Sequence, residues 1–346
     1  MSTSISIIIV TWNGLGWLKS FLPSVVSSLI DHAEVIVADN ASTDGSADWV
    51  RSHFPQVKVQ SFDQNYGYCG GNNRAAAAAS GKLLIFLNND VEVGTGWLKP
   101  ITDAFNNRPT LGAAQPKILA HGDRTRFEYA GAAGGMMDRY GYPFCLGRVF
   151  DTCEIDTGQY DHLTADIFWA SGAALAIRRD VFLEAGGFDE DFQFHMEEID
   201  LCWKLHRMGY TVSCIPESVV YHVGGGSLDS GSARKLAFNM RNNLAMLYKH
   251  LPAGRFWTVF MIRSILDGAA AVRELLRGRF RHFWAIASAA DHFLLNIGGI
   301  HKKRRVLIEK QLPFKTDKLS PVLLPWRYFV MRTKTASKLL DKFGTV

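Results

Sequence analysis

An apolar run that stops at three polar residues is the first place where the chain could do chemistry. Residues 83–87 are all apolar, and Asn88, Asn89 and Asp90 follow directly. An uncharged run of this length predicts a buried strand. Ligands of open α/β sheets bind beyond the carboxyl ends of strands, so Asp90 is a candidate for binding a metal ion or a phosphate. Asp and Asn also end strands because they form turns, and that interpretation stays open.

Two earlier apolar runs end in the same way. Residues 5–10 lead into Thr11 and Asn13, and residues 35–38 lead into Asp39 and Asn40. A short strand is also expected at residues 57–59, which with the run at residues 83–87 gives four strands. Helical segments separate these strands. This alternation predicts right-handed βαβ units and a parallel sheet. The polar strand ends would then lie at one edge of one sheet, which indicates a ligand site there.

A glycine-rich run precedes the strand at residues 83–87. It contains Asn65, Gly67, Gly71 and Asn72, and we expect a helix to begin at Arg74. The run matches neither the dinucleotide-binding motif nor the P-loop. Glycines before a helix still let backbone N–H groups approach a phosphate, and Arg74 would add positive charge. A flexible turn is the alternative.

Three acidic residues crowd the start of a later helix. The helical spacing of apolar residues places Glu197, Glu198 and Asp200 in its first turn. The helix dipole favours carboxylates there, which is the ordinary explanation. Three acids in four residues exceed what capping requires, so one of them is a candidate general base. His222 ends the last expected strand and would be a metal ligand if it meets Asp90.

The composition and the cysteine pattern indicate which classes of protein this chain can belong to. The 346 residues are 47% hydrophobic and 21% charged, which is typical of a globular protein. The net charge of +5 fits anionic partners such as nucleotides or a membrane surface, and we find no nucleic-acid motif. Five cysteines without a C-x-x-C pair indicate reduced thiols, and we find no signal peptide. We therefore expect a cytoplasmic protein.

Seven short motifs, in this order and spacing, resemble family 2 inverting glycosyltransferases. The similarity covers residues 4–250 and lies nearest the rhamnosyltransferase-like branch that builds bacterial O-antigen and capsule. The motifs are Thr11-Trp12-Asn13, Asp39 to Ser46, Asn65 to Asn73, Leu87 to Asp90, Gly172-Ala173, Gly186 to Asp189 and Glu197 to Cys202.

The resemblance implies a GT-A fold, which is a Rossmann-like, mostly parallel sheet flanked by helices. It also implies a donor such as a dTDP- or UDP-sugar and a glycan or lipid-linked acceptor. In this comparison, Asp90 and His222 would hold Mg²⁺ or Mn²⁺. The donor site would contain Thr11, Asn13, Asp39, Asn40, Asp44, Asn65, Gly67, Gly71, Asn72, Arg74, Asn88 and Asn89.

The acidic motif implies the catalytic residues. Glu198 would be the base that activates the acceptor hydroxyl, beside Glu197, and Asp200 would orient it or contact the acceptor. Trp169 and Gly172 would lie on the acceptor side. Two departures from the family pattern matter. Asn88 stands where the metal-binding triplet usually begins with Asp, and Glu198 stands where the base is usually Asp.

We expect residues 1–250 to form the catalytic domain. Its donor half would be residues 1–115 and its acceptor half residues 116–250. Residues 251–346 contain amphipathic helices rich in Arg, Trp and Phe. Such helices fit a membrane interface, and the basic residues 301–305 fit anionic lipid. Packing on the catalytic domain or in a homodimer is the alternative.

Two other functions compete with an inverting glycosyltransferase. A catalytically silent module could bind a nucleotide-sugar or a glycan on the same fold, but the acids at Asp90 and Glu198 speak against it. A nucleotidyltransferase could use a similar sheet. That class has a basic, glycine-rich loop after the first strand, whereas residues 11–14 lack it.

Overall fold

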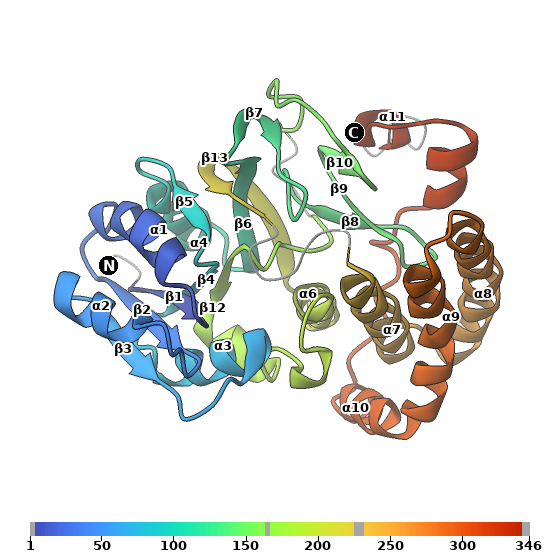
Figure 1. Ribbon diagram of the computed structural model, residues 1–346, viewed down its shortest axis with the longest axis horizontal. Coiled ribbons are helices and arrows are strands. Elements are labelled where there is room, and N and C mark those ends of the chain that lie inside the picture. The colour runs from blue at the N-terminus through green and yellow to red at the C-terminus, as the bar shows by residue number, and fades with distance from the viewer. Residues whose placement is uncertain (1–3, 163–166, 225–231, 341–346) are drawn as a thin grey trace.

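The computed structural model describes residues 4–162, 167–224 and 232–340. A sheet with helices on both faces forms one half of the molecule, and the C-terminal helices stack beside it (Figure 1). The α/β class and the C-terminal helical extension expected from the sequence are therefore confirmed.

The first four strands form the parallel half of the sheet, in the order β3-β2-β1-β4. They are β1 (Ile5–Thr11), β2 (Ala33–Asp39), β3 (Lys58–Ser61) and β4 (Leu83–Leu87). All three neighbouring pairs are parallel, and Thr11 lies opposite Asp39. The carboxyl ends of β1, β2 and β4 therefore lie at one edge of the sheet, as the sequence predicted.

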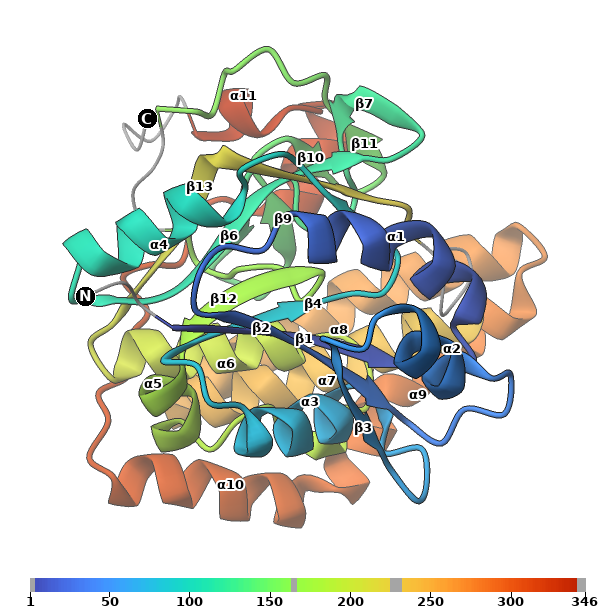
Figure 2. The same cartoon turned by 90° about the vertical axis from the view of Figure 1, so that its left-hand side faces the viewer.

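Apolar side chains cover both faces of these strands, because helices pack on each face. Ile7 and Ile9 belong to the layer of α1 (Leu15–Ser27), α2 (Ser46–His53) and α4 (Leu98–Asn107). Ile8 and Phe86 belong to the opposite layer, with α3 (Gly67–Ala78), α5 (Arg179–Glu184) and α6 (Glu197–Arg207). Figure 2 shows α1 on one side of the sheet and α3 on the other.

The second half of the sheet is mixed. The strand β12 (Ala174–Arg178) is antiparallel to both β4 and β6 (Leu111–Ala120). Beyond β6 come β13 (Thr211–His222), which is parallel to it, and the short β5 (Val91–Val93). A hairpin strand, β7 (Asp123–Phe127), also pairs with β6. A separate small sheet contains β8 (Gly135–Met137), β9 (Pro143–Cys145), β10 (Arg148–Val149) and β11 (Thr152–Cys153).

The C-terminal helices pack against the catalytic half through α7 (Ala233–His250), which lies beside α6 and α9 (Figure 1). The others are α8 (Ala253–Leu276), α9 (Phe280–Leu295), α10 (Ile297–Glu309) and α11 (Ala336–Leu340), with single turns η1 (Glu190–Phe192) and η2 (Trp326–Val330). Within the described residues, no helix is long and apolar enough to cross a membrane.

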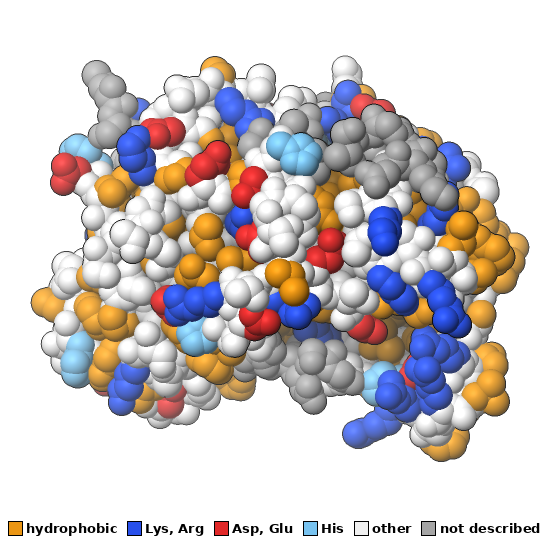
Figure 3. All heavy atoms as spheres, turned by 90° about the horizontal axis from the view of Figure 1, so that it is seen from above, with side chains coloured by type: hydrophobic (Ala, Val, Ile, Leu, Met, Phe, Trp, Pro, Cys, Tyr) orange, Lys and Arg blue, Asp and Glu red, His pale blue; other side chains and the backbone are white. Residues whose placement is uncertain are grey.

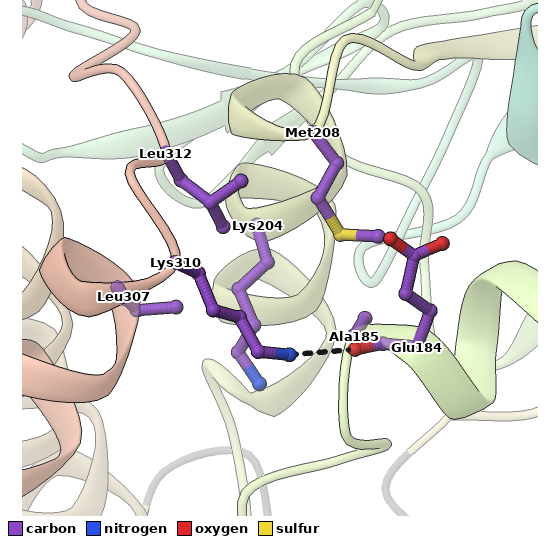
Figure 4. Close-up of a pocket in the computed structure, with 7 residues that line it drawn as sticks. All are labelled: Glu184, Ala185, Lys204, Met208, Leu307, Lys310 and Leu312. Carbon is purple, nitrogen blue, oxygen red and sulfur yellow. Dashed lines mark hydrogen bonds between the residues drawn. The ribbon is translucent and has the colours of Figure 1, made fainter.

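The segment after α10 returns to the catalytic half. Trp203 Nε1 on α6 donates a hydrogen bond of 2.9 Å to the carbonyl of Lys315. A cavity of about 240 Å³ lies where α10 meets α5 and α6. Figure 4 shows Lys310 reaching across this cavity to the carbonyl of Glu184, at a distance of 3.1 Å. The cavity lies at the contact between these elements, and none of the polar residues at the ends of β1, β2 and β4 lines it.

A buried cluster of charges joins α6, α7 and α10. Asp200 has no exposed surface, and its carboxylate lies 2.8 Å from Lys249 Nζ and 3.0 Å from His250 Nε2. Lys249 also contacts Asp189 at 2.7 Å, and Lys303 of α10 pairs with the same aspartate. Burial opposes ionisation of Asp200, but Lys249 and its neighbours hold the pKa of that carboxyl well below its usual value.

Removing one partner of this cluster should destabilise the fold strongly. In Lys249→Met, two buried carboxylates lose their shared cation, so we expect a loss of about 3–5 kcal/mol in the free energy of unfolding. Arg305→Met breaks an exposed pair with Glu309 and should cost less than about 1 kcal/mol. Urea titration of both variants measures the difference. Equal effects would contradict a structural role for the cluster.

Candidate active site

The ends of β1, β2 and β4 bring buried polar side chains together. Thr11, Asp39 and Asn40 are almost wholly buried. Asn89 Nδ2 donates to the hydroxyl of Thr11 at 3.1 Å, which connects the ends of β1 and β4. The edge of the sheet therefore carries hydroxyl, amide and carboxylate groups from three strands, a surface suited to the polar groups of a ligand.

Asn13 and Asp44 shape the loops that border this edge. The side-chain oxygen of Asn13 accepts a hydrogen bond of 2.8 Å from the backbone N–H of Thr43. Asp44 accepts from the N–H of Leu15 at 2.9 Å and from that of Ser46 at 3.1 Å, so one carboxylate caps the starts of α1 and α2. The sequence suggested a donor contact for Asp44, and the structure shows its oxygens engaged with backbone.

The glycine-rich run lies inside α3, which begins at Gly67. The sequence placed the start of this helix at Arg74, because glycine disfavours helix interiors. Gly71 explains the difference: a Cβ added there would lie 3.0 Å from Val10 and from the Asn40 amide. The missing side chain lets α3 approach the sheet closely. The ends of α3 and β2 are also joined, since Asn40 Nδ2 donates to the carbonyl of Gly67 at 3.0 Å.

The other residues proposed in this run are held locally. Asn65 accepts a hydrogen bond of 2.8 Å from the N–H of Gly67, and Asn72 donates one of 3.0 Å to the carbonyl of Tyr68. Arg74 is in the second turn of α3, not the first. Its guanidinium lies 3.5 Å from the ring centroid of Tyr66 and 3.2 Å from the carboxylate of Glu190.

Asp90 and His222 meet, as the family resemblance implied. Asp90 Oδ1 lies 3.1 Å from His222 Nε2, and both side chains are almost wholly buried. The amide of Asn88 lies 3.5 Å from the same nitrogen. On the other side of the imidazole, Nδ1 of His222 is 3.3 Å from Glu128 Oε2. Burial lowers the pKa of an imidazole, but the two carboxylates outweigh it and raise the pKa of His222 to about 10.

Glu128 is the residue that sequence analysis missed. It is buried and follows β7, in the part of the chain where no periodicity was visible. A carboxylate beside the second nitrogen of a histidine is the usual arrangement around a metal-binding histidine, because it fixes the orientation of the ring. The only sequence signal was an acid next to a strongly apolar neighbour, Phe127.

Asp90 and His222 fit a divalent cation. Within the described residues, no three His, Cys, Asp or Glu side chains are grouped so as to hold a metal ion. Two ligands about 2.1 Å from an octahedral ion, at right angles, lie about 3 Å apart. The 3.1 Å between Asp90 Oδ1 and His222 Nε2 agrees with this value. Two protein ligands suffice when the phosphates of a substrate supply others.

Glu197 and Glu198 begin α6, and each keeps a carboxylate oxygen that no described side chain pairs with. One carboxylate oxygen of each is buried and unpaired within the part of the chain that the structure describes. The preceding backbone is strained, since Gln193, His195 and Met196 have φ values of 56°, 66° and 74°. Burial raises the pKa of Glu197 well above its usual value, with a contribution from Glu198, and raises that of Glu198 to about 7.

Gly172 connects the acidic pair to the edge of the sheet. A Cβ added at Gly172 would lie 3.8 Å from Cβ of Glu198 and 3.0 Å from the hydroxyl of Tyr68. The next residue, Ala173, accepts a hydrogen bond of 3.0 Å from the N–H of Asn88. The dipeptide Gly172-Ala173 thus lies next to Glu198 at the start of α6 and is hydrogen-bonded to Asn88 after β4.

Two other candidates do not reach this site. Asp200 is turned toward α7 and is enclosed by the charge cluster. Trp169 is also buried, and its Nε1 donates to the carbonyl of Met136 at 2.9 Å. A Cβ on Gly135 would overlap the indole, which shows how tightly the ring is packed. Helical spacing in the sequence could not predict which of the three acidic side chains at the start of α6 would face α7.

Comparison with known proteins adds the family. Residues 6–157 match the model of glycosyl transferase family 2. The family model thus matches the N-terminal part of the chain. The resemblance noted from the sequence motifs is therefore confirmed over this part of the chain. The match covers β1 to β11 and leaves the acidic pair and α7 outside.

Two curated relatives carry informative names. The chain is 26% identical over 294 residues to an N-acetylglucosaminyl-diphospho-decaprenol L-rhamnosyltransferase of Mycobacterium tuberculosis, covering 81% of this chain and 94% of that protein. It is 31% identical over 217 residues to the O-antigen biosynthesis protein RfbC of Myxococcus xanthus, covering 58% of this chain and 16% of that protein.

Solved structures support the GT-A fold. GalNAc-T7 with UDP, GalNAc and Mn²⁺ superposes with a TM-score of 0.56 at 21% identity, covering 71% of this chain and 48% of that chain. At this level of identity the likeness establishes the fold alone. The GT-A architecture inferred from the motifs is confirmed.

The raised pKa of Glu198 predicts a distinctive dependence of stability on pH. Between about pH 4.5 and 7, the folded chain keeps a proton that the unfolded chain has released, so wild-type stability falls as pH rises through this window. Glu198→Gln lacks this loss. We expect it to be more stable than the wild type at pH 8, by on the order of 1–3 kcal/mol, with a smaller gain at pH 4.5.

Chemical denaturation at the two pH values measures this effect. Glu217→Gln, at an exposed position of β13, is the matched control and should behave like the wild type. A Glu198→Gln variant that is less stable than the wild type at pH 8 would show that the carboxylate is a structural group.

Proposed function

We propose that this chain transfers a sugar, with inversion, from a nucleoside-diphosphate donor to a hydroxyl of a glycan or lipid-linked acceptor. One observation carries the proposal. An unpaired acidic pair and a buried carboxylate–imidazole pair lie on different elements of one site and are connected through Gly172 and Ala173. Inversion needs a base on one side of the anomeric carbon and a positive charge at the leaving diphosphate on the other.

Glu198 is the base in this proposal. A pKa of about 7 lets its carboxylate accept a proton from a hydroxyl near neutral pH. Glu197 is buried beside it, and burial together with the neighbouring Glu198 raises the pKa of Glu197 well above its usual value, so the pair resists carrying two negative charges. The strained loop before α6 fixes where the two carboxyl groups point.

The donor would lie along the ends of β1, β2 and β4. Thr11, Asp39 and Asn40 offer buried polar groups to the base and the ribose, and Asn88 and Asn89 border the diphosphate. Because the Mycobacterium tuberculosis relative is named as a rhamnosyltransferase, a dTDP- or UDP-sugar, with rhamnose as the sugar, is the donor we propose.

Asp90 and His222 would hold Mg²⁺ or Mn²⁺, and Glu128 would orient the imidazole. The bound cation would neutralise charge on the leaving diphosphate. Mn²⁺ in the GalNAc-T7 structure and the 3.1 Å spacing of the two ligand atoms support this assignment.

We propose that the enzyme works at the inner face of the cell membrane, in surface polysaccharide synthesis. The names of both relatives, one acting on a decaprenol-linked compound and one in O-antigen biosynthesis, support this setting. Exposed apolar side chains on α8 and α9, such as Leu276 and Trp284, support contact with lipid.

A silent nucleotide-sugar-binding module is the alternative, and a panel of donors separates the two. We expect turnover of one UDP-, GDP- or dTDP-sugar with Mn²⁺ or Mg²⁺, measured as released nucleoside diphosphate. EDTA should abolish it, and Asp90→Ala should lower it at least 100-fold, because the leaving group loses its cation. Asp103→Ala, at an exposed site on α4, is the control. Donor binding without any turnover would favour the silent module.

Glu128→Gln tests the orientation of His222. Loss of the outer carboxylate should weaken Mn²⁺ binding by about 10- to 100-fold while the fold is kept. Electron paramagnetic resonance of free Mn²⁺ gives the affinity directly, without activity. Asp123→Asn, on the exposed part of the same hairpin, should leave it unchanged. An unaltered affinity in Glu128→Gln would remove Glu128 from the site.

A further inference from the structure

We propose that a basic groove between the start of α7 and the turn joining α8 to α9 binds the diphosphate of a lipid-linked acceptor. The exposed apolar side chains beside the groove would contact its polyprenyl chain. This inference rests on the proposed function and names the part of the acceptor that the C-terminal helices recognise.

The groove is strongly cationic. It has a volume of about 620 Å³, and its lining contains three arginines, one histidine and no acidic residue. The lining residues are Ser232, Ala233, Arg234, Gly278, Arg279, Phe280, Arg281 and His282. Glu274 of α8 pairs with Arg279 of the lining and also with Arg277, so one carboxylate is shared by two guanidinium groups. Excess guanidinium groups in one concavity favour a ligand with several anionic oxygens.

An apolar surface adjoins the cationic groove. Leu276 is 82% exposed, Phe280 62% and Trp284 65%, and all three lie on or beside the turn between α8 and α9. Figure 3 shows Lys and Arg side chains next to hydrophobic ones on its right-hand side, over the C-terminal helices. Phe280 belongs to both the lining and the apolar surface. A ligand with an anionic head and a long apolar chain satisfies both at once.

The groove is connected to the candidate active site. Its Arg234 stacks over Phe238 at 5.7 Å, and Phe238 contacts Phe194 with 6.0 Å between ring centroids. Phe194 lies in the strained loop that leads into Glu197 and Glu198. The neighbouring His195 has a buried Nε2 without a hydrogen-bond partner among the described residues. The groove is thus connected through Phe238 to the loop that precedes the acidic pair.

The other basic segment of this region is less suited to the task. Residues 301–305 looked available for anionic lipid, but the protein uses most of them. Lys303 pairs with Asp189 and Asp191, and Arg305 lies 3.1 Å from Glu309. Arg304 donates to the carbonyls of Tyr248 and Leu251. The groove therefore has the larger share of cations that face outward.

Vesicle flotation of the full chain tests the proposal without requiring catalysis. Three phosphatidylcholine vesicles are compared in EDTA and without nucleotide: one with a polyprenyl diphosphate, one with phosphatidylglycerol at matched charge, and one with polyprenol. We expect the wild type to favour the diphosphate vesicles. Arg279→Gln/Arg281→Gln should bind them at least 10-fold more weakly, because charged hydrogen bonds are lost. Lys302→Gln/Arg305→Gln is the charge-matched control and should bind normally.

Three results would overturn the proposal. Equal recovery on diphosphate and phosphatidylglycerol vesicles would show a general anionic-surface contact. Unchanged binding by Arg279→Gln/Arg281→Gln would place the contact elsewhere. Full competition by inorganic pyrophosphate, at the concentration where the lipid itself binds, would show a free-diphosphate site in which the lipid chain plays no part. Because the assay measures binding, failure of sugar transfer would leave its outcome readable.

Discussion

The buried pair of Asp200 and Lys249 is the interaction on which the arrangement of the site depends. It connects α6 to α7, and Lys303 extends the same cluster to α10. Residues two positions apart on an α-helix point about 200° apart, so Asp200 and Glu198 face opposite directions. With Asp200 held against α7, the side chain of Glu198 faces the opposite side, toward Gly172. If Glu198 is the base, as proposed, its position is therefore set by the contact of α6 with the C-terminal helices.

Several features of the site cost stability. Among the described residues, one carboxylate oxygen each of Glu197 and Glu198 is buried without a hydrogen-bond partner, and three residues before them occupy the left-handed region of backbone space. Each feature is unfavourable alone, and burial of an unpaired acid is the larger cost. The buried charge cluster, in which Asp and Lys side chains are equal in number, can hold α6 in place despite these costs. An active site is expected to combine unfavourable features at its reactive groups with well-paired residues in the structure that supports them.

The sequence indicated the parts of the site that depend on local pattern. Apolar runs located β1, β2 and β4, and parallel topology then placed Thr11, Asp39 and Asp90 at one edge. The meeting of Asp90 and His222 was implied by the family resemblance and not by this rule. Glu128, the direction of Asp200 and the burial of Trp169 depend on which distant elements touch, and spacing along the chain holds no such information. The early start of α3 escaped detection because Gly71 serves packing against Val10, which outweighs helix propensity.

The stereochemistry of transfer tests the central claim most directly. With the donor that turns over, proton NMR of the first product formed gives the anomeric configuration before it can equilibrate. A base at Glu198 opposite the leaving diphosphate predicts a product whose configuration is inverted relative to the donor. A product with retained configuration would contradict the account, because a single displacement assisted by one base cannot give it.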